Sequence, residues 1–440
     1  MASATDTIAP GQPIQLPAMK LQLTPSDQAM IDGERGEAAS LAMRIVAAMA
    51  SVTGAEGLID VTSAHVDGCL YHGQASLDFA GRLVAGGARV AIPTTLNVGS
   101  VDLLHPDLYR GDAESAARGR RLMELYVSMG CRPTWTCAPY QLPERPSFGQ
   151  HVAWAESNAV VFANSVLGAR TDRYGDFIDI CAAISGRAPA AGFHLDQNRA
   201  GQILFRLDGV SKSLLAQDVL FPVLGHLVGS EAGTLVPVIE GLPGSVSEDQ
   251  LKALGAAAAS SGAVALFHAV GITPEARSVE EAFGGTEPRR VVQVTPSRLV
   301  QARDSLSTVG GDRIDAVSVG TPHFSVAEFA RLTPLLERAA IASGVDFFVS
   351  TSRQVLAEVE SHGWLDVYHR AGVKLVVDTC TYVTPILKPS HRVVMTNSAK
   401  WAYYAPGNVG VDVVFGSLEE CVHSAAEGRV RRDEALWRRG

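Results

Sequence analysis

Three stretches in the second half of the chain decide the fold: RIDAVSVGTPH (313–323), VDFFVSTSR (345–353) and VKLVVDTC (373–380). Each is a short apolar, β-branched run that breaks into polar residues at its C-terminal end, and helical patterns lie between the runs. Such runs are typical of strands buried on both faces of a parallel sheet. In open α/β sheets ligands bind beyond the carboxyl ends of the strands, so the polar ends are where we expect the chemistry.

The same alternation extends toward the N-terminus. Further strands are predicted in GLIDVTSAHVDG (57–68), ARVAIPTTLNVG (88–99), RPTWTCAPY (132–140), residues 263–267 and RRVVQVTP (289–296). Helices are predicted from an N-cap at Ser26 or Asp27 through Ser51, in SLDFAGRLVAGG (76–87) and in ESAARGRRLMELYVSMG (114–130). The pattern predicts an α/β/α body with mainly parallel sheets.

The length of 440 residues predicts two or three lobes. Residues 1–22 are rich in Pro and Ala without periodicity, which predicts a flexible tail. We expect the catalytic body to span residues 23–425, with a lobe change near 215 and a return near 373. Residues 426–440 form a charged C-terminal tail, expected as an exposed helix or arm.

The charge balance limits the partners. Lys and Arg total 37, Asp and Glu total 46, and the net charge is −9. An acidic chain of this kind is a poor ligand for bare nucleic acid or an anionic membrane. No signal peptide and no stretch long enough for a membrane span is found, so we expect a cytoplasmic protein.

Familiar catalytic motifs are missing from the sequence. It has no P-loop, no H-E-x-x-H and no G-x-S-x-G. The cysteines instead carry the strongest signal, because Cys69, Cys137 and Cys380 each follow an apolar run and have small polar neighbours. Three thiolates that met at the strand ends would suit zinc or an iron–sulfur cluster and leave one metal position open. The alternative is that each is a small buried apolar residue, as we expect for the other three cysteines.

Polar residues near these cysteines are candidates for substrate chemistry. They are Ser63, His65, Asp67, Thr95, Asn97, Glu156, Ser157, Arg170, His323, Ser352, Arg353 and Lys400. Structural alternatives exist, because Ser352 follows a strand and can cap the next helix, and Arg170 can form a surface pair with Asp172. His268, within an apolar run, is expected to be a core histidine.

Together these blocks resemble a known family, the large subunit of aconitase X, from about Leu21 to about Cys421. The matching blocks are SAHVDGCLYHG (63–73), PTTLNVG (93–99), TWTCAPYQ (134–141), HVAWAESNAVVFANSVLGARTDRYGD (151–176), HLDQNR (194–199), VPVIEGLP (236–243), SGAVALFHAVGITPEA (261–276), TSR (351–353), DTC (378–380) and NSAKWAYYAPG (397–407). The resemblance implies an aconitase-like, multi-lobed α/β/α body around an iron–sulfur cluster. It also implies a small swivelling domain, which we expect as a separate chain in a heterodimer.

Two activities are known in this family, the dehydration of cis-3-hydroxy-L-proline in bacteria and of (R)-5-phosphomevalonate in archaea. The archaeal pattern has a cysteine at the position of Thr321 and lacks the one at Cys69, so this chain is similar to the hydroxyproline type. The resemblance then implies Cys69, Cys137 and Cys380 as cluster ligands, with Cys69 replacing the ligand missing at Thr321. Both a 2Fe–2S and a cubane cluster stay open.

The expected reaction is the elimination of water from cis-3-hydroxy-L-proline, a small amino acid, to give Δ1-pyrroline-2-carboxylate in hydroxyproline degradation. Catalytic roles are expected for Ser63, His65, Asp67, Thr95, His323 and Lys400, and substrate binding for Asn97, Glu156, Ser157, Arg170, Ser352 and Arg353. By resemblance to aconitase, the base is expected to be a serine of the swivelling domain.

Three alternatives stay open at this point. One is 5-phosphomevalonate dehydration, for which the sequence shows no clear phosphate loop. Another is a hydrolase with Cys137 or Cys69 as nucleophile, activated by His65. The third is a non-catalytic scaffold for the small subunit.

Overall fold

The three stretches that decide the fold are neighbouring strands of one parallel sheet, as predicted. The structure is a computed structural model that describes residues 21–438, and most of the predicted flexible tail lies outside them. The sheet has the order β12-β11-β10-β13-β14, and its strands are β10 (Ala316–Phe324), β11 (Asp346–Thr351), β12 (Val373–Val376), β13 (Val393–Thr396) and β14 (Asp412–Phe415). Every residue of β10 is buried, including the polar Ser318, Thr321 and His323, as expected for a central strand covered on both faces.

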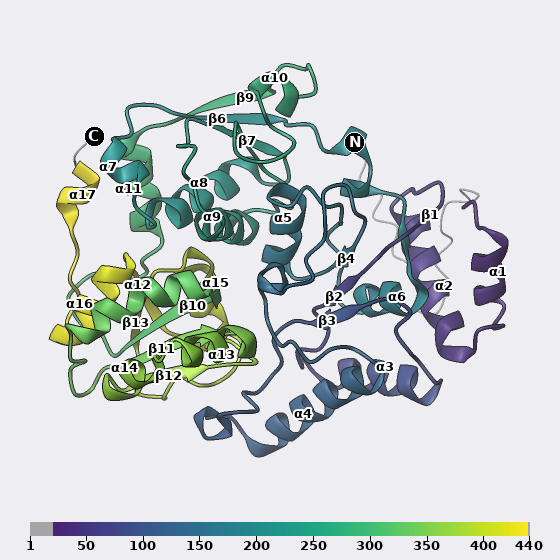
Figure 1. Cartoon of the computed structure of the whole chain (residues 1–440), viewed down its shortest axis with the longest axis horizontal. Helices are drawn as coiled ribbons and strands as arrows, with labels where there is room; N and C mark the ends of the chain where they lie inside the picture. The colour runs from purple at the N-terminus through teal and green to yellow at the C-terminus, as the bar shows by residue number, and fades with distance from the viewer. Residues whose placement is uncertain (1–20, 439–440) are drawn as a thin grey trace, which may run out of the picture.

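Helices cover this sheet and form one lobe of the molecule (Figure 1). They are α12 (Val326–Glu337), α13 (Arg353–Ser361), α14 (Leu365–Arg370), α15 (Ala399–Val409) and α16 (Leu418–Glu427). The last helix, α17 (Glu434–Arg438), packs instead against α7 (Lys212–Leu215) and α11 (Pro296–Ser305), which precede this sheet in the chain. The C-terminal segment is not a free arm, because Trp437 is buried and lies under the guanidinium of Arg303. This contact corrects the expectation of an exposed helix at the chain end.

A second lobe precedes this one in the chain. Its parallel sheet has the order β8-β7-β6-β9, with β6 (Ile203–Leu207), β7 (Pro237–Glu240), β8 (His268–Ala269) and β9 (Arg290–Val294). Its helices are α7 (Lys212–Leu215), α8 (Leu220–Ala232), α9 (Glu248–Ser261), α10 (Val279–Ala282) and α11 (Pro296–Ser305). Helices α8 and α9 approach closely, since a Cβ at Gly225 would lie 2.2 Å from the carbonyl oxygen of Leu254.

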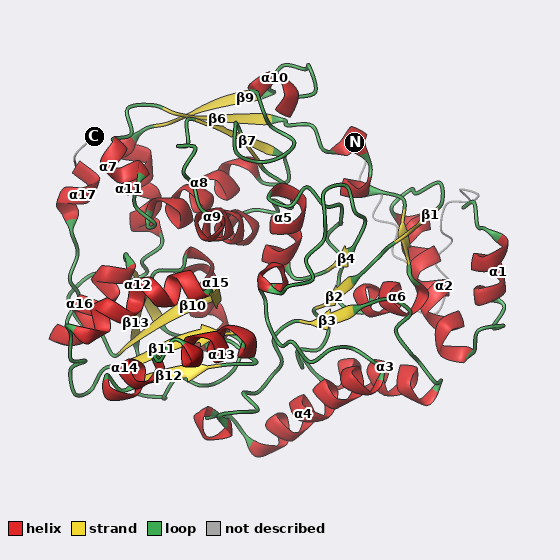
Figure 2. Ribbon diagram, viewed as in Figure 1, coloured by secondary structure: helices red, strands yellow, loops and turns green. Residues whose placement is uncertain are grey.

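The first lobe holds two small sheets (Figure 2). The parallel sheet β3-β2-β4 and the antiparallel pair β1-β5 comprise β1 (Leu58–Asp60), β2 (Ala64–Val66), β3 (Thr94–Leu96), β4 (Ala153–Trp154) and β5 (Arg187–Pro189). The helices are α1 (Pro25–Ile31), α2 (Glu37–Val52), α3 (Gln74–Ala85), α4 (Ala113–Ser128), α5 (Ser157–Ser165) and α6 (Ile178–Ser185). Four 3-10 helices are η1 (Pro106–Leu108), η2 (Pro139–Gln141), η3 (Gly192–His194) and η4 (Asp196–Asn198).

Some predicted elements differ from the structure in their bounds. The first helix is capped by Thr24 rather than by Ser26 or Asp27, since the Thr24 side chain accepts from the Asp27 backbone. Residues 132–140 are not a strand, and residues 263–267 are buried extended chain that leads into β8. Both runs are apolar enough to suggest strands, but few of their backbone groups face a neighbouring strand.

The sheets also divide the chain differently from the predicted boundaries near 215 and 373. The chain enters the second sheet at Ile203 and the third at Ala316, and the strand that begins at Val373 stays in the third sheet. Among the described residues, no helix is long and apolar enough to cross a membrane.

Candidate active site and metal centre

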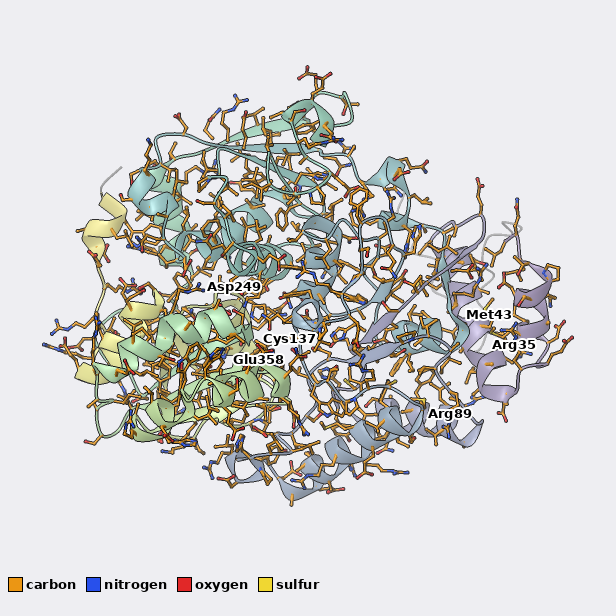
Figure 3. The ribbon with its side chains drawn as sticks, in the orientation of Figure 1. Arg35, Met43, Arg89, Cys137, Asp249 and Glu358 are labelled. Atoms are coloured by element: carbon orange, nitrogen blue, oxygen red, sulfur yellow. The ribbon has the colours of Figure 1, made fainter. Side chains whose placement is uncertain are left out.

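Two of the three predicted cysteine ligands meet in space. Cys137, His323 and Cys380 each offer a ligand atom, and these atoms lie within 4.8 Å of one another. Cys137 lies just before η2 in the first lobe, His323 lies in β10, and Cys380 follows β12. All three residues are buried, and Figure 3 shows Cys137 where the first and third lobes meet. Two thiols and an imidazole are soft to intermediate ligands that suit zinc or iron.

The backbone around His323 holds this group in place. The backbone N–H of His323 donates to Sγ of Cys137 over 3.3 Å. Its Nδ1 lies 3.1 Å from Oγ1 of Thr136, and its Nε2 lies 3.2 Å from the carbonyl oxygen of Thr379. Because that carbonyl can only accept, Nε2 carries the proton and Nδ1 accepts from the hydroxyl of Thr136. Burial lowers the pKa of His323 to about 4, so the ring is neutral at pH 7.

A hydrogen bond links the two thiols. Burial alone would raise the pKa of Cys137, but a hydrogen bond from Cys380, the Lys400 ammonium and the His323 amide hold it below its ordinary value. The pKa of Cys380 is raised, because its thiol donates to Cys137 and because it is buried. Cys137 is therefore the thiol that ionises first, which is the state a metal ligand needs.

A buried ion pair lies beside the thiols. Nζ of Lys400, at the start of α15, pairs with Oε1 of Glu156, the N-cap of α5. Oε2 of Glu156 accepts from the backbone N–H of Ala159 at 2.7 Å and from Nδ2 of Asn158 at 2.8 Å. Lys400 also reaches Oγ of Ser157 at 3.4 Å. Burial would lower the pKa of Lys400, but the carboxylate of Glu156 holds it well above its ordinary value, so the pair is ionised.

The ends of β2 and β3 supply a second group of polar side chains. Nδ1 of His65 lies 2.8 Å from Oγ1 of Thr95, while its Nε2 is buried without a hydrogen-bond partner. Burial lowers the pKa of His65 to about 4. Nδ2 of Asn97 donates to Oδ1 of Asp67, whose pKa is raised to about 7 by burial and by the nearby negative charge of Glu156.

Cys69 lies outside the thiol group. Its Sγ faces the carbonyl oxygens of Val66, Asn97 and Val98 at 3.4 to 3.7 Å. Burial raises its pKa well above the ordinary value. Val98, whose carbonyl oxygen faces Cys69, belongs to the same buried cluster as Cys137 and Cys380.

Several residues that we expected to bind the substrate are bonded to other groups of the protein. Arg170 pairs with Asp196, not with Asp172, and Arg353 forms two bonds of 2.6 Å with the carboxylate of Asp378. Oγ of Ser352 accepts from the Val355 backbone and caps α13, which confirms the structural alternative.

The candidate Ser63 and the expected core histidine His268 lie in separate surroundings. Ser63 lines a cavity of about 200 Å³ that also contains Thr95 and Trp154. His268 is the core histidine expected from the sequence, since its Nε2 lies 2.7 Å from the carbonyl oxygen of Arg199.

Sequence reasoning missed two residues that support the site. Thr136 precedes Cys137, and its strand-like context gave no sign that it orients an imidazole. Lys252 was not singled out from the sequence, yet it is 2% exposed and its Nζ lies 3.3 Å from the carbonyl oxygen of His323. It pairs there with Asp249 and Glu328.

Family models match most of the chain. They are described as aconitase X first domain at residues 20–197, second domain at 201–304 and third domain at 314–427. The chain belongs to the aconitase X family. A crystal structure of Thermococcus kodakaraensis aconitase X in its holo form has a TM-score of 0.83 with this chain at 34% identity. It covers 92% of this chain and 100% of its own, which confirms the predicted fold class.

The curated relatives are dehydratases. A cis-3-hydroxy-L-proline dehydratase of Pseudomonas aeruginosa is 46% identical over 93% of this chain and 71% of its own length. A second, from Hypocrea jecorina, is 41% identical over 93% of this chain and 69% of its own. A phosphomevalonate dehydratase large subunit of Methanothermobacter thermautotrophicus is 39% identical over 90% of this chain and 96% of its own. This aconitase X chain is therefore a hydro-lyase, and the scaffold and hydrolase alternatives are set aside.

The geometry is also inconsistent with a hydrolase in which His65 activates a cysteine. That hypothesis needs His65 to activate Cys69 or Cys137. Among the described residues, the hydrogen bonds of Cys69 go to carbonyl oxygens and the ring of His65 bonds to Thr95.

Proposed function

We propose that this aconitase X dehydrates cis-3-hydroxy-L-proline to Δ1-pyrroline-2-carboxylate. Identities of 46% and 41% to two dehydratases of that name support this substrate over 5-phosphomevalonate, whose dehydratases are 31 to 39% identical. The observation that carries the chemistry is the buried Cys137–His323–Cys380 group with the Lys400–Glu156 pair beside it.

An iron–sulfur cluster fits the residues of this group. Cys137 and Cys380 are adjacent, one is poised to ionise, and an amide N–H already points at its sulfur. We assign these two as thiolate ligands and keep Cys69, as inferred from the sequence, as the third. When bound, the cluster supplies a Lewis acid that helps a hydroxyl group to leave. Either cluster type named above is compatible with this assignment.

Lys400 is proposed to bind the substrate as a cation. Its ammonium has three N–H donors, of which Glu156 and Ser157 take two. Glu156 is held by two further donors, so its charge does not depend on Lys400 alone. The third N–H of Lys400 is then available for the substrate carboxylate or hydroxyl, where a positive charge favours the developing negative charge.

Two neutral histidines are proposed to orient the hydroxyl and hold protons. Nε2 of His65 is a buried nitrogen without a partner, and Thr95 fixes the ring from the other side. His323 stays oriented by Thr136 and Thr379. The C3 hydroxyl and the C2 proton leave together as water, and the resulting enamine tautomerises to the imine. The base that takes the C2 proton is proposed to be a serine of the swivelling domain.

A separate small chain is the proposed partner, in a heterodimer located in the cytoplasm. Five curated relatives are named large subunits, and this chain aligns with 96 to 100% of their length. The name of those relatives supports a small subunit for this chain.

The test is turnover by the oxygen-free, reconstituted complex with the small swivelling chain encoded in the same genome. Incubation with cis-3-hydroxy-L-proline should yield Δ1-pyrroline-2-carboxylate, detected by its adduct with o-aminobenzaldehyde. (R)-5-phosphomevalonate is the second arm. Turnover of the phosphate substrate alone would transfer the assignment to the other branch of the family, and turnover of neither by an iron-loaded complex would refute both.

A further inference from the structure

The cations near the proposed site are already neutralised. Each residue that we expected to meet a substrate carboxylate or phosphate has a carboxylate partner of its own. These pairs are Arg170 with Asp196, Arg353 with Asp378, and Lys400 with Glu156. The surroundings of the thiol group are therefore not strongly cationic, which is unfavourable for a phosphate group.

One carboxylate near the thiols has no cation. Oδ1 of Asp67 accepts from Nδ2 of Asn97, while Oδ2 makes no hydrogen bond or ion pair with any residue between 21 and 438. Asp67 is half-buried and keeps part of its surface exposed. Asn97 is 3% exposed, and its Oδ1 is buried without a partner. A buried acceptor without a donor is costly and calls for one in the bound state.

This pair lies next to the thiols. Asn97 precedes Val98, which belongs to the same buried cluster as Cys137 and Cys380. A substrate held at Asp67 is thereby within reach of the proposed metal centre.

We propose that Asp67, supported by Asn97, binds the secondary ammonium of the substrate and so selects a cyclic imino acid over a phosphate. A pyrrolidinium nitrogen has two N–H donors, and Oδ2 of Asp67 and Oδ1 of Asn97 are two acceptors without donors. A carboxylate makes a stronger bond to an ammonium group than an amide oxygen does. This inference rests on the proposed function, because it assumes that the substrate carries an ammonium group at this site.

The test compares two ligands that differ only in charge at the ring heteroatom. L-proline has the ammonium, and (S)-tetrahydrofuran-2-carboxylate has a neutral oxygen in its place. Binding is measured by calorimetry on the iron-loaded complex with the small subunit. The wild-type protein should bind L-proline more tightly. Asp67→Asn should weaken the binding of L-proline about 10- to 100-fold, which is the usual loss for a hydrogen-bonded charge. The binding of the oxygen analogue should change less than about threefold.

Two further variants serve as a control and as a replacement for Asp67→Asn. Asp176→Asn removes the same charge from an exposed neighbour of Asp67 and should leave the preference for L-proline intact. If Asp67→Asn loses iron or does not fold, Asn97→Ala takes its place. This variant should weaken the binding of L-proline about three- to tenfold and leave the binding of the oxygen analogue unchanged.

The outcomes separate this inference from the proposed function. Absence of hydroxyproline turnover by the wild-type complex contradicts the proposed function. Equal binding of L-proline and the oxygen analogue by the wild-type protein, or an equal loss of both in the variant, overturns the role of Asp67 whatever the turnover.

Discussion

The backbone N–H of His323 donates to Sγ of Cys137 over 3.3 Å, and this bond joins the third lobe to the first at the thiol group. The carbonyl of the same residue accepts from Nζ of Lys252 at 3.3 Å and from Nε2 of Gln141 at 3.4 Å. The backbone N–H and the carbonyl of His323 are therefore both hydrogen-bonded. One of the donors to the carbonyl, Lys252, belongs to α9 of the second lobe. An N–H bond of this kind stabilises a thiolate over a thiol.

Replacing Cys137 with serine should abolish both cluster and turnover. The hydroxyl of serine does not ionise at neutral pH and is a poor ligand for iron, so one thiolate is lost. The measurement is iron and acid-labile sulfide per chain after oxygen-free purification, with the visible spectrum. Cys421→Ala is the matched control, because Cys421 is equally buried but packs in the third-lobe core. Full activity of the Cys137 variant would refute the cluster mechanism.

The third ligand is decided by comparing Cys69 with His323. If Cys69 is the ligand, as we propose, Cys69→Ser should lose iron and His323→Asn should retain it. Sγ of Cys69 faces backbone carbonyl oxygens, and Nε2 of His323 lies near the carbonyl oxygen of Thr379. These contacts alone do not decide which of the two residues is the third ligand. The reverse result, with iron lost only in His323→Asn, would assign the ligand set to the group that lies within 4.8 Å.

The strands could be predicted from the sequence because β10 to β12 are apolar on both faces and end in polar residues. The same pattern singled out Cys137 and Cys380, whose thiols do meet, although the run before Cys137 is not a strand. The partners of charged residues could not be predicted, since Arg353 finds Asp378 only after the third lobe folds. Lys252 shows the same limit, because an ordinary helical sequence does not reveal that its ammonium is buried between lobes.

Breaking the buried pair of Lys400 and Glu156 should destabilise the protein strongly. Lys400→Met leaves the carboxylate of Glu156 buried without its cation, and the expected loss is about 3–5 kcal/mol in the free energy of unfolding. Lys400→Met combined with Glu156→Gln should recover most of this loss, since the amide oxygen still accepts from Ala159 and Asn158.

Urea unfolding of the single and double variants measures this effect, and turnover is followed in parallel. Activity should stay low in the double variant although stability returns, because the proposed cation for the substrate is absent. Recovery of activity together with stability would show that Lys400 has a structural role only.

Acid should destabilise the protein through a histidine far from the thiols. His194 is buried, and burial together with the charges of His151, Arg199 and Arg170 lowers its pKa to about 3. Its Nδ1 lies 3.0 Å from Nδ1 of His151, and the hydroxyl of Tyr174 bonds to Nε2. The ring is therefore held neutral in the folded state.

The direction of the pH effect follows from these values. Between pH 6.5 and about 3 the unfolded chain binds a proton at His194 that the folded chain does not, so the free energy of unfolding falls as the pH falls. From pH 7 to pH 5 this one group contributes a loss of about 2 kcal/mol. His194→Gln should remove that part of the pH dependence in urea unfolding at the two pH values. His72→Gln, on an exposed residue, is the control and should leave the dependence unchanged. An unaltered slope in His194→Gln would mean that other groups, such as His65 and His323, carry the acid sensitivity.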